Sequence, residues 1–195
     1  MRDGRVRVAL TRDDDRFLVL DERAGIARRL GADLFVSIHA DAVADAGAGD
    51  SASGATVYTL SDRGSDAVAD ALAGRENRSD MVNGVALGGK SDAVSSILVD
   101  LSRRDMRARS LGLSDLILRE GQGHLRFHAD PQREAAFVVL KSLDLPSVLV
   151  EAGYISNPAD VRDLSDRGWR SGFAGALASA IEIYLARQEA GSGNP

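Results

Sequence analysis

The chain has 195 residues, a formal net charge of −5, an apolar fraction of 44% and no cysteine. Its length and apolar fraction suit one globular domain with its own core, which excludes a wholly disordered protein. The lack of cysteine excludes disulfide scaffolds and thiolate metal sites, and the acidic balance disfavours nucleic acid as a partner.

Segments with the pattern of strands and of helices alternate along the chain. Four segments show the alternation or the short apolar run of strands, at 6–10, 34–38, 55–60 and 146–150. Five segments show the helical spacing of apolar residues, at 20–30, 62–74, 93–119, 158–166 and 169–187. The segment 135–140 fits either a helix or a strand. This alternation predicts an α/β fold with helices on both faces of a sheet.

Two residues that can bind a metal or move a proton stand directly after predicted buried strands. His39 follows the run 34–38, and Glu151 follows the run 146–150. Sites in open α/β sheets form beyond the carboxyl ends of strands, so we expect both side chains at one edge of the sheet. An imidazole there can bind zinc, and a carboxylate whose pKa is raised by burial can take a proton from water. The alternative is that both residues only cap loops.

Several motifs occur in order along the chain: LTRDDD at 10–15, SIHADA at 37–42, AFVVLK at 136–141 and PSVLVEAGYISNP at 146–158. Together they resemble the conserved blocks of the zinc-dependent N-acetylmuramoyl-L-alanine amidases of the type 3 amidase family. The resemblance runs from about residue 6 to about residue 185. It implies a twisted, mostly parallel α/β sheet flanked by helices on both faces.

The resemblance also implies a chemistry. His39 falls at a zinc-ligand position of the family, and Glu151 falls at its catalytic glutamate. The implied activity is hydrolysis of the amide bond between N-acetylmuramic acid and L-alanine in peptidoglycan, with zinc as cofactor. Such enzymes act in cell-wall remodelling and daughter-cell separation, so the implied location is periplasmic or extracellular.

The chain departs from the family pattern at its start. Family members have an earlier strand that ends in a DPGHGG-type motif with a ligating histidine, and a later glutamate ligand; neither motif occurs here. We therefore expect an N-terminally truncated catalytic domain over 1–188 that lacks the first strand and the other metal ligands, followed by a disordered tail at 189–195. His124 and His128 are expected to be surface or capping residues.

Residues 75–128 resemble the helical regulatory insertion of the cell-division amidases. In those relatives the insertion covers the active site until an activator protein binds. Glu76 is the candidate for an autoinhibitory metal contact, and the alternative is a solvated glutamate on an ordinary surface helix.

Other functions remain to be weighed against this one. The main alternative is a truncated, non-catalytic remnant without a complete zinc site. A serine or cysteine hydrolase has little support, because the chain has no cysteine and no Gly-x-Ser-x-Gly turn. No apolar run reaches membrane-spanning length, and the first residues lack the apolar stretch of a signal peptide.

Overall fold

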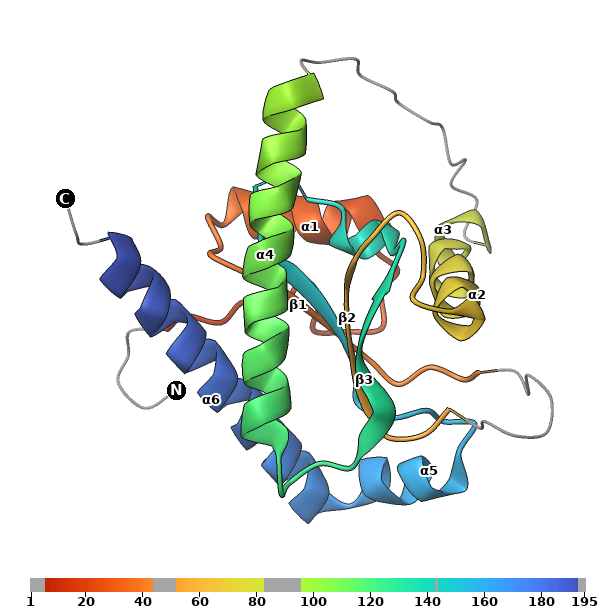
Figure 1. Cartoon of the computed structure of the whole chain (residues 1–195). Helices are drawn as coiled ribbons and strands as arrows, with labels where there is room; N and C mark the ends of the chain where they lie inside the picture. The colour runs from red at the N-terminus through yellow and green to blue at the C-terminus, as the bar shows by residue number, and fades with distance from the viewer. Residues whose placement is uncertain (1–5, 44–51, 83–95, 143, 193–195) are drawn as a thin grey trace.

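The computed structural model describes residues 6–43, 52–82, 96–142 and 144–192 (Figure 1). The strands are β1 Phe35–His39, β2 Ala55–Leu60, β3 Phe127–Ala135 and β4 Ser147–Glu151. The helices are α1 Leu20–Arg29, α2 Ala67–Asn77, α3 Ser79–Val82, α4 Ser96–Gly121, α5 Pro158–Ser165 and α6 Arg167–Ser192, with a 3-10 turn η1 at Val138–Leu140. Among these residues, no helix combines the length and the apolar character needed to cross a membrane.

The strands form one mixed sheet in the order β1-β4-β2-β3. β1 runs parallel to β4, and β2 runs parallel to β3, whereas β2 and β4 are antiparallel. The predicted mostly parallel α/β sheet is therefore confirmed. One edge of the sheet gathers the carboxyl ends of β1 and β4 together with the start of β2, and the candidate site forms there.

Helices cover both faces of the sheet, as the sequence pattern predicts (Figure 1). On one face α4 and α6 pack against the strands, in a core that contains Val57, Leu113, Val148, Val150 and Leu177. On the other face α1, α2 and η1 enclose a second core with Leu20, Tyr58, Leu72, Phe137 and Leu149. The sheet lies between the two cores, and β1, β2 and β4 contribute to both because successive side chains point to opposite faces.

Several predicted helices are confirmed, with shifts at their ends. α1 ends just before Gly31, which has a φ of 63° and supplies the left-handed turn that stops a helix. α2 begins at Ala67 and not at residue 62, because the Asp66 side chain caps it by accepting from the N–H of Ala69. α6 continues to Ser192, so residues 189–192 of the expected tail are helical. Residues 193–195 of that tail lie outside the described residues.

The predicted strand at residues 6–10 is wrong. The segment has no regular structure, and Val8 and Leu10 are 69% and 73% exposed. Alternation and β-branching favour a strand only where a neighbouring strand can accept its hydrogen bonds, and no described strand pairs with this segment.

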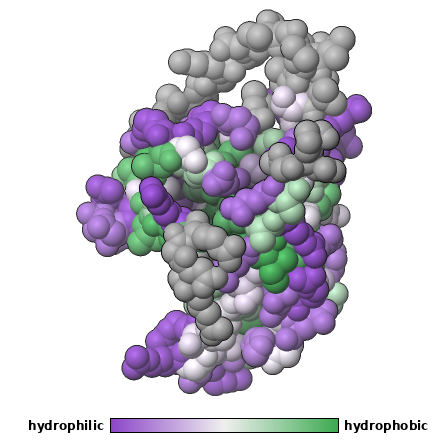
Figure 2. Space-filling view, turned by 90° about the vertical axis from the view of Figure 1, so that its left-hand side faces the viewer, coloured by the Kyte–Doolittle hydropathy of each residue, from purple (hydrophilic) through white to green (hydrophobic). Residues whose placement is uncertain are grey.

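Figure 2 shows apolar surface in separate patches between hydrophilic ones on one side of the molecule.

The region 75–128, which the sequence predicts to be a helical insertion, includes part of the core. The second half of α4 is core, since Leu113, Leu116 and Ile117 are at most 3% exposed and pack with α6 and the sheet. The strand β3, which begins at residue 127, has no counterpart in the prediction, because its polar stretch and Pro131 hide the strand pattern. Residues 83–95 of the insertion lie outside the described residues.

Candidate functional site

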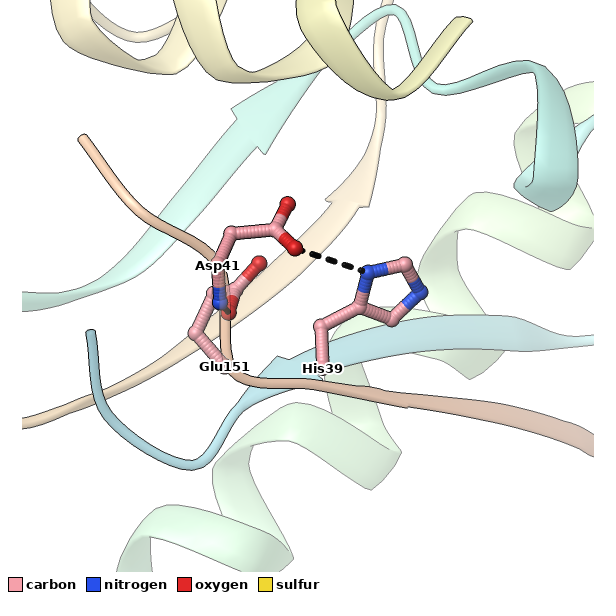
Figure 3. A group of neighbouring side chains, drawn as sticks. All are labelled: His39, Asp41 and Glu151. Carbon is pink, nitrogen blue, oxygen red and sulfur yellow. Dashed lines mark hydrogen bonds and ion pairs between the residues drawn. The ribbon is translucent and has the colours of Figure 1, made fainter. Parts of the chain in front are cut away.

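His39 and Glu151 end two adjacent parallel strands, and they are direct partners in the register of the sheet. The N–H of Ala152 donates to the carbonyl of His39 at 2.9 Å, which extends the pairing past both strand ends. Ligand atoms of His39, Asp41 and Glu151 all lie within 4.8 Å of one another (Figure 3). The expectation that His39 and Glu151 meet at one edge of the sheet is confirmed.

Asp41 is the residue of this group to which the sequence reasoning gave no role. Its backbone N–H donates to Glu151 Oε2 at 3.1 Å, and its Oδ1 lies 3.8 Å from His39 Nδ1. The available signal was its place in the SIHADA motif, two residues after His39. Asp41 follows the last residue of β1 by two positions, and its carboxylate turns back toward His39 at the end of the strand.

Glu151 is fully buried, at 0% exposed. Within the described residues its Oε1 has no hydrogen-bond partner. Burial raises the pKa of Glu151 from the ordinary 4.5 to about 8, and the negative charge of Asp41 adds to the increase, while His39 opposes it. This direction agrees with the rise in pKa that the buried strand predicts.

His39 is surrounded by carboxylates. Burial of the ring lowers its pKa, but Asp41, Glu76 and Glu151 together raise it by more, so that the pKa lies above its ordinary value. Its Nε2 also lies 2.8 Å from Ser37 Oγ. These carboxylates favour the protonated form of the His39 ring, and a metal can bind the ring only after that proton has left. Metal binding at His39 should therefore be stronger at higher pH.

Glu76 reaches the site from the last turn of α2. Its Oε1 lies 3.9 Å from His39 Nε2 and 3.8 Å from Arg23 Nη1, and its side chain is 13% exposed. The alternative of a solvated surface glutamate does not fit this burial. Glu76 is thus a fourth acidic or imidazole side chain at the edge where β1 and β4 end.

The end of α2 is attached to the core on both sides of Glu76. Arg75 donates to the carbonyl of Ala42, and Asn77 donates to the carbonyl of Ala136 and accepts from the N–H of Val138. Four residues after Glu76, the buried Asp80 accepts from the N–H of Leu20 at the start of α1. These contacts hold Glu76 over the site.

The other two histidines lie elsewhere. His128 Nδ1 accepts from the N–H of Asp130 at 3.0 Å, and His124 is exposed in the turn after α4. Neither belongs to the group of possible metal ligands found among the described residues. His128 lies within β3, where this hydrogen bond joins its ring to the backbone of the same strand.

The group suits a metal ion chemically. One imidazole nitrogen and carboxylate oxygens within 4.8 Å of one another are donors that zinc accepts. The buried Glu151 Oε1, which has no partner among the described residues, is satisfied by a proton or by a neighbouring cation. The residues present therefore fit a bound cation at this edge of the sheet.

Comparison with known proteins gives this geometry a context. The family profile of N-acetylmuramoyl-L-alanine amidase, Amidase_3, matches residues 1–183. The chain belongs to this amidase family. N-acetylmuramoyl-L-alanine amidase AmiA of Escherichia coli K12 is 40% identical over 186 residues, which cover 95% of the chain and 63% of AmiA. AmiC of Neisseria meningitidis is 35% identical over 179 residues, which cover 91% of the chain and 42% of AmiC.

A solved structure of the amidase family agrees with the fold. The N-acetylmuramoyl-L-alanine amidase AmiC2 of Nostoc punctiforme has a TM-score of 0.56 and 25% identity, over 91% of this chain and 72% of AmiC2. This amidase chain spans less than two thirds of the length of the AmiA and AmiC proteins that it matches.

Proposed function

We propose that the protein hydrolyses the amide bond between N-acetylmuramic acid and L-alanine in peptidoglycan, with zinc as its cofactor. The observation that carries the proposal is the buried Glu151 carboxyl group beside His39 at the shared end of β1 and β4, in a chain of the amidase family. The catalytic domain in this proposal spans residues 1–188. Because peptidoglycan is the substrate, we place its action in the periplasm or outside the cell, in wall remodelling and daughter-cell separation.

His39 and Asp41 are the proposed metal-holding residues of this chain. Zinc, when bound, supplies a Lewis acid that polarises the substrate carbonyl and lowers the pKa of water. His39 is fixed by its strand pairing with Glu151, and Asp41 is fixed by the hydrogen bond from its own N–H to Glu151 Oε2. The backbones of both residues are therefore fixed at one edge of the sheet, and their side chains carry the atoms that would bind the metal.

Glu151 is the proposed general base. Its Oε1 is free to take a proton from the attacking water, and the same carboxyl group can then pass that proton to the leaving nitrogen of L-alanine. A pKa of about 8 in the metal-free chain means that the site holds a proton well near neutral pH. A positive charge nearby lowers this pKa and makes the carboxylate form available for catalysis.

Glu76 is the proposed autoinhibitory residue. Its carboxylate lies 3.9 Å from the imidazole nitrogen His39 Nε2, so it competes with a substrate carbonyl for the same space. An activator protein that binds the protein better with α2 moved away would shift the balance toward the open site. The regulatory segment in this proposal is the part of 75–128 that precedes the core half of α4, and it begins at the last turn of α2.

A non-catalytic remnant is the second candidate function. The observation that favours it is the single imidazole in the group of possible ligands among the described residues. A catalytic zinc normally has three protein ligands, and histidine is the commonest of them. The amidase proposal predicts turnover of peptidoglycan, whereas the remnant proposal predicts none.

The test is release of stem peptides from purified sacculi by the zinc-loaded protein, in the longest form that the gene encodes. Wild-type protein should release peptides, whereas Glu151→Gln should lose at least a hundredfold in turnover and keep its zinc content within twofold. Glu120→Gln on α4 is a suitable control. A variant at Glu151 with near-normal release would remove this residue from the mechanism, and an inactive wild type would favour the remnant.

A further inference from the structure

Asp160 is a buried carboxylate that the proposed mechanism does not use. It lies in the first turn of α5, and its side chain is 1% exposed. Its oxygens accept from the backbone N–H of Gly54, at 3.2 and 3.0 Å, and from the N–H of Tyr154, at 2.8 Å. The guanidinium of Arg126 donates to the same carboxylate. Hydrogen bonds to an ionised acceptor are roughly twice as strong as those between neutral groups.

The two backbone donors lie just beyond Glu151, at the same end of the antiparallel β2–β4 pair. Thr56 of β2 is the cross-strand partner of Glu151. Gly54 precedes Thr56 by two residues, and Tyr154 follows Glu151 by three. Asp160 therefore connects the start of β2 to the segment that leaves β4, directly beyond the Thr56–Glu151 pair.

Close packing leaves this connection little freedom. Gly54 has a φ of 83°, and a Cβ added there would lie 2.7 Å from the backbone of β3. A Cβ added to Gly153 would lie 3.1 Å from the Cβ of Asp160. Asn157 caps α5 by accepting from the N–H groups of its first turn, so Asp160 is held at the helix end where negative charge is favoured.

Glu151 needs such support because few contacts hold its own side chain. Oε2 accepts one hydrogen bond, from the N–H of Asp41, and Oε1 has no partner among the described residues. Its position is therefore set mainly by the backbone on either side of it. A catalytic group must be held within about 0.5 Å of its productive position to be effective.

We propose that Asp160 is a positioning residue for Glu151, which it holds in place through Gly54 and Tyr154. The inference rests on the proposed function, in which Glu151 is the general base. In Asp160→Asn an NH₂ group replaces one of the two oxygens, and an NH₂ group cannot accept from a backbone N–H. The variant keeps the shape of the side chain and weakens both attachments, because the one remaining oxygen is a neutral acceptor and the ion pair with Arg126 is lost.

The first experiment compares steady-state kinetics of the zinc-loaded protein, in the longest form that the gene encodes. Asp160→Asn should lower kcat at least tenfold per folded molecule, with KM and zinc content within twofold of wild type. Ser110→Ala is the matched control, because Ser110 Oγ accepts from the N–H of Ser147 at the opposite end of β4, at 2.9 Å. This control should keep kcat within twofold, although it also removes a buried hydrogen bond.

The second experiment measures amide hydrogen exchange of the metal-free chain. The N–H groups of Gly54 and Tyr154 should exchange at least tenfold faster in Asp160→Asn and at the wild-type rate in Ser110→Ala. Unchanged exchange would overturn the connection itself. Faster exchange with an unchanged kcat, or an equal loss of kcat in Ser110→Ala, would show a structural role alone and overturn the proposal.

Two results separate this proposal from the proposed function. An inactive wild type, or an active Glu151→Gln, would contradict the proposed function without any variant at Asp160. If Asp160→Asn fails to fold, Arg126→Ala decides, because Arg126 is 42% exposed and its loss removes the group that holds the Asp160 carboxylate against both backbone donors. A threefold or larger loss of kcat in that variant supports the proposal, and an unchanged kcat overturns it.

Discussion

At the scale of single residues, the proton on Glu151 is the feature with the clearest energetic consequence. The carboxyl group is removed from water, and only one backbone N–H among the described residues donates to it. Under these conditions the charged form is disfavoured and the folded state holds a proton that the unfolded chain releases. A bound cation would favour the charged form of Glu151, which is the form that the proposed catalysis needs.

The raised pKa of Glu151 predicts a pH dependence of stability in the metal-free chain. The folded pKa of about 8 lies above the ordinary 4.5, so the folded state binds more protons than the unfolded state between these values. The free energy of unfolding should therefore fall as the pH rises from about 4.5 to about 8. Glu151→Gln does not titrate, so its stability relative to wild type should rise over this range by a few kcal/mol, at about 1.4 kcal/mol per pKa unit.

Urea unfolding of both proteins with a chelator, between pH 5 and pH 8.5 in steps, would measure this difference. Titrating groups that do not interact with Glu151 are common to the two proteins and cancel in the comparison. A difference that stays flat across the range would show that Glu151 is not protonated in the folded chain.

Asp41 gives a second prediction at this scale. Asp41→Ala should weaken zinc binding at least tenfold, because the variant removes a carboxylate that lies 3.8 Å from His39 and within the candidate ligand group. Asp33→Ala is the matched control, since Asp33 is exposed near the opposite end of β1. Isothermal titration with zinc measures the effect, and equal affinities for the two variants would exclude Asp41 from the site.

At the scale of elements, the two halves of the 75–128 region differ in role. The end of α2 is attached over the site by Arg75 and Asn77, whereas the second half of α4 fills the space between α6 and the sheet. Removal of Leu113 and its neighbours would open a cavity in the core, and a single buried leucine replaced by alanine costs about 2–5 kcal/mol. A deletion of the whole region thus unfolds the domain and cannot test regulation.

A point variant in α2 tests regulation without this damage. Glu76→Ala should raise basal activity at least threefold in the absence of any activator, because it removes the carboxylate that lies beside His39. Glu22→Ala on the exposed side of α1 should leave activity unchanged. Peptide release from sacculi is the measurement, with thermal unfolding to confirm the fold, and an unchanged activity in Glu76→Ala would leave this residue a purely structural role.

At the scale of the whole molecule, the number of ligands sets what the chain can bind. The described residues bring one imidazole and several carboxylates to the site, and Glu151 is assigned to proton transfer. We expect the 195-residue chain to bind zinc with a Kd weaker than about 1 μM, which corresponds to about −8 kcal/mol. Structural zinc sites reach roughly 10–16 kcal/mol.

Competition with a chromogenic chelator at pH 7.5 would measure this affinity. His39→Ala should reduce it to the background of nonspecific binding. Stoichiometric binding at nanomolar zinc would contradict the prediction, and His124→Ala and His128→Ala would then be the next variants to measure.

Much of the site followed from local pattern. An apolar run of strand length places its last residue at an edge of the sheet, so His39 and Glu151 were predictable as neighbours once both runs were recognised. The helical spacing of apolar residues likewise predicted α1, α5 and α6, because a helix must bury one face whatever it packs against. These features depend on residues close together in the chain.

Other features depend on partners that are distant in the chain, and only the tertiary structure decided them. Residues 6–10 have a strand pattern without a neighbouring strand to pair with, and β3 is a strand because β2 lies beside it. Glu76 reaches His39 across 37 positions of sequence, and Asp160 meets Gly54 across 106. Local sequence carries propensity and periodicity, whereas burial, pKa and coordination arise from the three-dimensional arrangement of groups whose pairing the local pattern does not encode.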